Sequence, residues 1–464
     1  MGFRIHLRKG LLYLEQEHWM QEGHLRRVLT LWDLIVYGIV LIMPIAAVPL
    51  YGLVEVQSGG HAVPALLIGM VAMTLTAYSY GKMASKYPAA GSAYTFVSQG
   101  LNPHAGFIAG WAMLVDYLLV PIACVIYAAL AIERVAPGLP HWAWCLLLVT
   151  AITGVNLIGV RSTASANLAL MISALVVIVP FMGLAIHWLL VHQGWPGVLS
   201  TAPLYNPATF HWKSLAGATA LAALTYGGFD GVSTLSEEVE NPRRNIMLAT
   251  IIVCVFTGLF SSMQVYLAQR VQGDVTHLFN VETAFMDVAR MVGGKYLFSA
   301  LGAILIASCL GSGLTAQAGV SRLLYGMGRA GALPRTFFGH LSARFSVPTW
   351  NLLLTAVLAF LGSLWLSYER VAELINFGAF LAFMGVNAAA IKTFYLQAAK
   401  DQRRVLADLL LPLGGLLFCF GIWCNLSTGA KVMGFTWLSA GIVYDIVRTR
   451  ILRRAPVPFD QENG

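Results

Sequence analysis

Residues 225–234 read TYGGFDGVST and interrupt a long apolar segment. The glycine pair Gly227-Gly228 weakens a helix at this point and lets a ligand approach the backbone closely. Asp230 then places a carboxylate beside the interruption. In hydrocarbon every backbone N–H and C=O needs an internal partner, so irregular backbone is tolerated only where protein covers it or where it lines a cavity. The stretch therefore predicts a membrane helix that is broken beside a polar cavity.

The first apolar segment carries a matching interruption, because residues 43–49 read MPIAAVP. Each of its two prolines removes a backbone donor and clashes with the preceding turn. A simple proline kink is the alternative interpretation of this segment. For Asp230 the alternative is an N-cap, whose carboxylate accepts from the N–H of Val232 or Ser233. Two broken helices at corresponding places in two halves of a chain nevertheless favour the binding site of a transporter.

The composition predicts an all-α integral membrane protein. The chain has 464 residues, of which 58% are hydrophobic and 11% charged, with a mean hydropathy of +0.71. A soluble domain is only about 45–50% apolar. Apolar runs of roughly 20 residues, enough to cross a bilayer, recur along the chain. About twelve spans are expected, near residues 28–53, 62–85, 104–132, 141–160, 165–190, 213–239, 246–269, 297–328, 348–367, 371–398, 407–424 and 432–448.

The spans divide into two groups of five with the interrupted helices, spans 1 and 6, at corresponding places. Because an odd number of spans brings the second group in from the opposite side, the pattern predicts a five-plus-five inverted repeat. Repeat 1 would cover 28–190 and repeat 2 would cover 213–398, with spans 11 and 12 added in 399–448. Residues 1–27 and 449–464 would form an N-terminal segment and a tail in the cytoplasm.

The basic residues predict the orientation. With a cytoplasmic N-terminus, the inner loops carry roughly three of every four of the 29 Lys and Arg residues, as the positive-inside rule requires. We therefore expect both termini in the cytoplasm of a cell whose inner membrane this protein spans several times. The formal charge of +8 then reflects topology and contact with anionic lipid of the bilayer. Because the basic residues are spread over many loops, no nucleic acid partner is expected.

Asp116 stands near the centre of span 3. A carboxylate at this depth costs about 2.5–3.5 kcal/mol on insertion scales, so it should face a partner or a wet cavity. No Lys or Arg lies at the centre of any span to neutralise it. Substrate or proton handling is one interpretation, and a structural hydrogen bond is the other. The candidate substrate-binding set is Pro44, Ile45, Ala46, Asp116, Tyr117, Tyr226, Gly227, Gly228, Phe229 and Asp230.

Three further residues are candidates for gating or coupling. Glu237 ends span 6, where it is either part of a solvated helix end or of an inner gate. Ser312 and Thr315 share one face of span 8, where hydroxyls either join packed helices or complete a cation site. The six cysteines have no metal-ligand spacing, and no catalytic triad or phosphate loop is present. No metal, no cofactor and no enzymatic activity are expected.

The chain resembles the amino acid–polyamine–organocation superfamily of permeases, and most closely its putrescine-importer-like branch. The similarity runs over nearly the whole chain. It rests on AYSYG at 77–81, PAAGSAYT at 88–95, NPH at 102–104, Gly110-Trp111, Asp116-Tyr117, GFD at 228–230, LSEE at 235–238, SRLLYGMGR at 321–329 and LINFG at 374–378. The resemblance implies the inverted-repeat fold with two extra helices, and uptake of an amine or amino acid coupled to protons or to exchange.

Two departures from the superfamily bear on substrate and coupling. Amino-acid permeases carry a glycine-rich break in span 1 that holds the substrate carboxylate, whereas this chain has Pro44-Ile45-Ala46-Ala47. Some relatives carry a lysine in span 5 in place of a sodium ion, whereas the similar region here is Met171-Ile172-Ser173-Ala174. The first departure weakens the case for an α-amino acid, and the second removes the lysine as a coupling device.

The sequence thus favours a secondary active transporter that imports a small amine such as putrescine by alternating access. Asp116 and Asp230 would receive ammonium groups or the coupling proton, with sodium as the alternative coupling ion. Tyr117, Tyr226 and Phe229 would supply aromatic walls for a cation, and carbonyls freed around Pro44 would complete the site. An amino-acid permease or exchanger of the same fold is the alternative substrate class. A non-transporting sensor or scaffold is the alternative of another class.

Overall fold

The computed structural model describes residues 29–87, 92–158, 164–236, 238–273, 280–329, 333–342 and 347–451. This part of the chain is helical, and its one isolated β-bridge joins Leu29 to Val239. Nine of its helical segments are long and apolar enough to cross a membrane. They are built on α4 (Ala62–Lys86), α6 (Pro103–Val135), α7 (His141–Ile158), α8 (Ala164–Val198), α10 (Pro242–Gln272), α11 (Ala284–Arg329), α14 (Tyr368–Ile391), α15 (Leu411–Cys424) and α16 (Thr428–Ile446).

Span 1 is broken, as the sequence predicts. Helix α2 (Leu31–Ile42) ends where Met43 takes a φ of 67°, a value that is uncommon for a residue with a Cβ. The chain then turns and continues through η1 (Val48–Leu50) into α3 (Tyr51–Ser58). We refer to α2, η1 and α3 together as broken helix 1.

Span 6 is broken at its glycine pair. Helix α9 (Trp212–Ala222) continues as η2 (Ala223–Tyr226), a turn of the tighter 3₁₀ helix. The helix is interrupted at Gly228, whose φ of 107° favours glycine. The chain then continues as η3 (Phe229–Leu235). These segments form broken helix 6. With the two broken helices and the shorter apolar α13 (Thr349–Trp365), every predicted span has a helical counterpart.

The packing repeats between the two groups of five spans. Helix α2 lies on α10, and its counterpart five spans later, α9, lies on α4. In the same way α6 packs on α14 and α13, while α11 packs on α8 and α7. The pairs α4–α10 and α6–α11 join the two groups directly. This is the pattern an inverted repeat produces, and the predicted fold class is confirmed; the exact segment boundaries stay a prediction.

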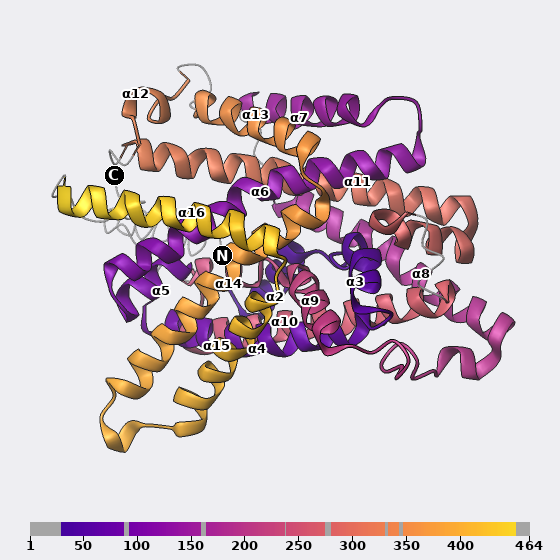
Figure 1. Ribbon diagram of the computed structural model, residues 1–464, viewed down its shortest axis with the longest axis horizontal. Coiled ribbons are helices and arrows are strands. Elements are labelled where there is room, and N and C mark those ends of the chain that lie inside the picture. Colours follow the sequence, from indigo (N-terminus) through magenta and orange to yellow (C-terminus); the bar gives the residue numbers. More distant parts are fainter. Residues whose placement is uncertain are drawn as a thin grey trace, which may run out of the picture.

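Two short helices from predicted cytoplasmic loops lie on one side of the molecule. Helices α5 (Ser92–Gly100) and α12 (Arg335–Phe338), both in predicted cytoplasmic loops, lie toward the left of Figure 1. Helices α3 and α8 lie toward the right. The two helices from predicted cytoplasmic loops thus lie on the same side of the molecule, while the orientation in the membrane stays a prediction.

Helix α16 holds α6 in place through a reciprocal tryptophan pair. The indole N–H of Trp111 donates to the Trp437 carbonyl at 2.9 Å, and that of Trp437 donates to the Trp111 carbonyl at the same distance. The two rings stack with centroids 4.9 Å apart. Because Asp116 follows Trp111 by little more than one helical turn, this clamp fixes the part of α6 that carries the intramembrane carboxylate.

Candidate functional site

The two breaks meet each other. A Cβ added to Gly228 would lie 3.5 Å from the Cβ of Leu41, at the end of α2. A Cβ added to Gly231 would lie only 2.7 Å from the Cδ1 of the same leucine. The start of η3 therefore rests directly on the last turn of α2. The two interruptions, which are far apart in the sequence, form one site.

Side chains from neighbouring helices satisfy the carbonyls at the breaks. Gln264 of α10 donates its amide N–H to the Pro44 carbonyl at 2.8 Å. Asn376 of α14 donates in the same way to the Ala220 carbonyl at 2.6 Å, near the point where α9 narrows to η2. The Pro44 carbonyl, which we expected to be free for a ligand, is thus already bonded. Pro44 and Ile45 are buried, and Ala46 is half-buried.

Two carboxylates, Asp116 and Asp230, lie near each other at the site. Both are half-buried, and they lie close enough for their negative charges to repel. The Asp230 carboxylate lies against the backbone N–H groups of Gly228 and Gly231. It therefore stabilises the glycine break itself, and these amides take the place of the Val232 or Ser233 N–H that the alternative N-cap interpretation named. None of the ion pairs within the described ranges involves either carboxylate.

Two tyrosines complete this acidic cluster. Tyr117 is 43% exposed, and it interacts electrostatically with both Asp230 and Asp116. Tyr37 of α2 is half-buried, interacts with Asp230 and hydrogen-bonds to Thr234. We define Tyr37, Asp116, Tyr117 and Asp230 as the acidic cluster. It offers two carboxylates and an accessible aromatic face, which is a set suited to an organic cation.

Tyr226 and Phe229 belong to the protein core, which corrects the expectation that both line the site. Both side chains are fully buried. The Tyr226 hydroxyl donates to the Leu66 carbonyl at 2.7 Å. Phe229 packs against Tyr80 and Phe383, with ring centroids 5.5 and 5.2 Å apart. Gly227, between them, is exposed. In this conformation Tyr117 is the one predicted aromatic wall that remains accessible.

A Tyr226→Phe substitution tests this structural role. We expect it to lower the free energy of unfolding by about 1 kcal/mol, because one buried hydrogen bond to Leu66 is lost. Substrate uptake per folded molecule should stay within about twofold of the wild type. Thermal unfolding in detergent and uptake in proteoliposomes give the two readouts. Loss of uptake at unchanged stability would instead place the hydroxyl in the binding site.

The structure does not add support for the gating and coupling candidates. Glu237 lies outside the described residues. Ser312 and Thr315 are exposed on α11, and the Thr315 hydroxyl donates to the Gly311 carbonyl of its own helix at 3.0 Å. Their roles as coupling groups stay predictions. Within the described ranges, no three His, Cys, Asp or Glu side chains gather as a metal site requires.

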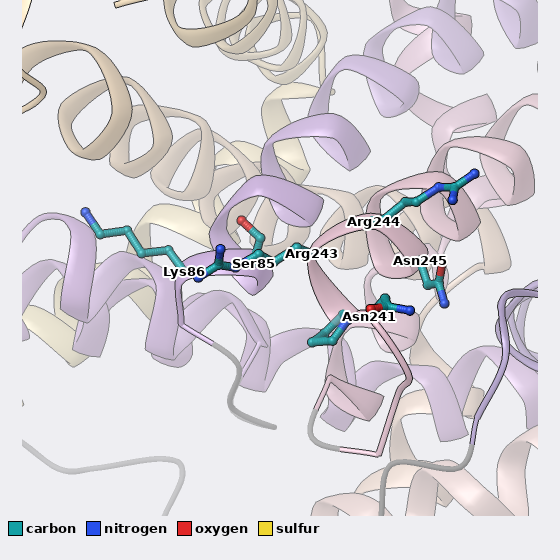
Figure 2. A pocket seen from close by; sticks show the side chains of 7 residues that line it. Ser85, Lys86, Asn241, Arg243, Arg244 and Asn245 are labelled. Atoms are coloured by element: carbon teal, nitrogen blue, oxygen red, sulfur yellow. The ribbon is translucent and has the colours of Figure 1, made fainter. Parts of the chain in front are cut away.

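A cavity of about 740 Å³ lies where the end of α4 meets the start of α10. Figure 2 shows Ser85 and Lys86 on one side and the turn from Asn241 to Asn245 on the other. Its charged lining residues, Lys86, Arg243 and Arg244, are all basic. Because this lining repels a cation, the cavity is not a candidate site for an amine.

Two backbone hydrogen bonds connect the chain before α2 with the chain after η3, on the side predicted to be cytoplasmic. The N–H of Leu29, just before α2, donates to the Glu238 carbonyl at 3.0 Å. The N–H of Glu240 donates back to the Leu29 carbonyl at 2.9 Å. The start of broken helix 1 is thereby tied to the chain that follows broken helix 6. We call these two bonds the inner latch.

Comparison with known proteins gives one consistent family. The family model described as amino acid permease matches residues 33–439. A low-affinity putrescine importer of Escherichia coli, PlaP, is 31% identical over 442 residues, which cover 94% of this chain and 96% of the importer. The branched-chain amino acid permease BcaP of Bacillus subtilis is 25% identical, over 92% of this chain and 94% of the permease. A vacuolar cationic amino acid transporter of Arabidopsis thaliana is 27% identical, over 75% of this chain and 60% of that protein.

Proposed function

Because the chain belongs to the amino acid permease family, we propose that it is a secondary active transporter that imports a small organic amine, with putrescine as the first candidate. The observation that carries the proposal is the pair of carboxylates, Asp116 and Asp230, that lie together without a basic partner in the described structure. Similarity to a putrescine importer along almost the whole chain supports the same substrate class.

The acidic cluster fits a diamine better than a zwitterion. Burying a cation is unfavourable unless opposite charge compensates it, and a dication needs two such groups. Asp116 and Asp230 supply two carboxylates, and the exposed ring of Tyr117 adds cation–π attraction. An α-amino acid would also need donors for its carboxylate, but the amides at Gly228 and Gly231 already face Asp230. The repulsion between the two empty carboxylates is relieved when the substrate binds between them.

The inner latch supplies the element that alternating access requires. In the present conformation its two backbone bonds tie the residue before α2 to the chain that follows broken helix 6. Breaking them would let α2 move away from η3 and open the acidic cluster toward the cytoplasm. Two backbone hydrogen bonds contribute little net free energy, so modest substrate-dependent forces suffice to break them.

The surroundings of the transporter complete the proposal. We place the protein in a bacterial inner membrane with both termini in the cytoplasm, on the distribution of its basic residues. The basic cavity at Lys86, Arg243 and Arg244 would then face anionic lipid headgroups of the inner leaflet. A proton is the proposed coupling ion, and a sodium-driven mechanism is the alternative.

Uptake of labelled putrescine into proteoliposomes tests the function. We expect accumulation when the lumen is alkaline relative to the medium, and competition by unlabelled diamines. A tenfold excess of a neutral amino acid should leave uptake within about twofold. Competition by neutral amino acids without competition by diamines would contradict the amine assignment. Binding without flux would contradict transport itself and select a sensor or scaffold.

An amino-acid permease or exchanger is the second candidate. It is favoured by the similarity to BcaP and to the vacuolar cationic amino acid transporter. A thermal-shift screen of the purified protein separates the candidates, because a bound ligand raises apparent stability by mass action. We expect diamines to raise the unfolding midpoint more than amino acids at equal concentration. The reverse order would select the second candidate.

A further inference from the structure

Glu55 is a buried carboxylate that the substrate site does not use. It lies in α3, the outer part of broken helix 1, and is 1% exposed. Its Oε2 is buried without a hydrogen-bond partner in the described structure. Its carboxyl group otherwise lies against the backbone N–H of Ala62, at the start of α4. An ionisable side chain at such a place in a membrane protein is a functional candidate by default.

The absence of a side-chain partner distinguishes Glu55 from the other buried carboxylates of the described ranges. The others each have one: Glu373 accepts from Ser427, Asp408 pairs with Lys82, and Asp445 pairs with His104. An ionised carboxylate is tolerated in a buried environment when it is paired and hydrogen-bonded. Glu55 lacks such a partner and is the most deeply buried of the four.

The groups nearest along the chain do not neutralise Glu55. His61 accepts the Asn206 N–H at its Nε2, 3.0 Å away, and its Nδ1 lies 3.1 Å from the Ser58 carbonyl. Because one ring nitrogen accepts and the other donates, this histidine is neutral. The Tyr51 hydroxyl is also buried and bears no positive charge. The local polar groups therefore favour the uncharged acid.

The elements packed against α3 do not supply a counter-charge either. These are α9, α4, α11, η1 and η5 (Val281–Thr283). Their charged residues include Lys213, exposed at the start of α9; Glu282 of η5; and Asp287 of α11, which pairs with Arg134. None of them is hydrogen-bonded or ion-paired to Glu55 within the described ranges. Placing a negative charge on Glu55 in this closed arrangement is strongly unfavourable.

Helix α3 closes tightly over this carboxyl group. A Cβ added to Gly52 would lie 2.8 Å from the Cβ of Ala284, at the start of α11. A Cβ added to Gly217 of α9 would lie 3.0 Å from the side-chain nitrogen of Gln57. The outer parts of broken helices 1 and 6 are thus in close contact. Glu55 can meet water from the outer side only when α3 moves away from these neighbours.

We propose that Glu55 carries the coupling proton, and that closure of α3 requires this proton. The inference rests on the proposed transport function. When the outer side is open, the carboxylate binds a proton from the external water and becomes a neutral acid. Closure then buries the neutral acid together with the substrate in the acidic cluster. When the inner latch then breaks while α3 stays closed on the outer side, the proton leaves toward the cytoplasm and the carboxylate is restored.

A Glu55→Gln substitution tests the proposal, because glutamine resembles the protonated acid but carries no exchangeable charge. The full-length protein is reconstituted, and labelled putrescine is followed in two assays. We expect counterflow at equal pH to stay within about threefold of the wild type. Stimulation of uptake by an alkaline lumen should be lost. Gradient stimulation equal to that of the wild type would overturn the proposal, as would loss of counterflow in a variant that unfolds at the wild-type temperature.

A second measurement covers a variant that does not fold. Putrescine added to detergent-solubilised wild type should cause uptake of protons, detected with a pH indicator in weakly buffered solution. No proton uptake would overturn the proposal without any variant. If the wild type transports no putrescine at all, the proposed function fails instead, so the two failures are distinguishable.

Glu373→Gln is the matched control. Glu373 is a second buried glutamate, but it is bonded to Ser427. We expect this variant to be less stable and to keep its gradient stimulation. The comparison also separates coupling from a purely structural role. If Glu55 only caps α4 at Ala62, the glutamine oxygen replaces the acceptor and gradient stimulation persists.

Discussion

Replacement of Asp116 by asparagine is expected to reduce putrescine uptake about 100-fold, which corresponds to about 2.7 kcal/mol. The substitution removes one of the two carboxylates that would compensate a bound dication. It should not destabilise the empty protein, because Asp116 and Asp230 repel each other. The unfolding temperature should stay the same or rise. Kinetics of labelled putrescine uptake in proteoliposomes, together with thermal unfolding, measure both effects.

The Asp116→Asn variant is also expected to have a different substrate preference from the wild type. With one carboxylate left, a monoamine should compete with putrescine better than it does in the wild type. The control is Asp401→Asn, which removes the same charge from an exposed position in a predicted cytoplasmic loop and should leave uptake within about twofold. Unchanged uptake in Asp116→Asn would remove Asp116 from the mechanism and leave Asp230 as the sole acceptor.

The breaks and the two carboxylates were predictable because each violates the apolar pattern around it. Gly228, Pro44 and Asp116 are all unfavourable in a continuous membrane helix, so local chemistry alone marks them. The directions of Tyr226 and Phe229 were not predictable in the same way. Between them the chain passes from a 3₁₀ turn through Gly228 at a φ of 107°. The φ angle of Gly228 sets the direction of the chain that follows and of its side chains. Its value depends on the helices that pack against the break, which the local sequence does not identify.

Two residues that the sequence does not single out, Gln264 and Asn376, form hydrogen bonds with partners that are distant in the sequence. Gln264 bonds Pro44 across 220 positions, and Asn376 bonds Ala220 across 156. A mid-span amide signals that a polar partner exists, but the sequence does not say which one. Asn376 lies in the LINFG motif, which indicates the family but does not identify the Ala220 carbonyl as the partner of its amide. Glu55 lies just beyond the predicted span 1 (28–53) but within α3, because helix ends cannot be placed within a few residues from hydropathy alone.

Substitution of Gly378, the last residue of the LINFG motif, is expected to have the second large effect, a loss of stability. A Cβ on this residue would overlap the backbone carbonyl oxygen of Ala112, so α14 touches the backbone of α6 directly. Gly378→Ala should therefore lower the free energy of unfolding by about 1–3 kcal/mol, the usual cost of overpacking. Backbone cannot rotate away as a side chain does, so the two helices must separate. Thermal unfolding of the purified variant in detergent measures the loss.

Gly421→Ala in α15 is the matched control, because nothing lies within 4 Å of the added Cβ. In an open helical position alanine is more favourable than glycine by up to about 1 kcal/mol. The same substitution should therefore leave stability unchanged or raise it at Gly421 and lower it at Gly378. Equal effects at both positions would contradict close packing between α6 and α14.

Asp116 lies one turn beyond Ala112, so separating these helices also displaces the carboxylate from Asp230. Uptake by Gly378→Ala should fall even below the unfolding temperature, where the variant is still folded.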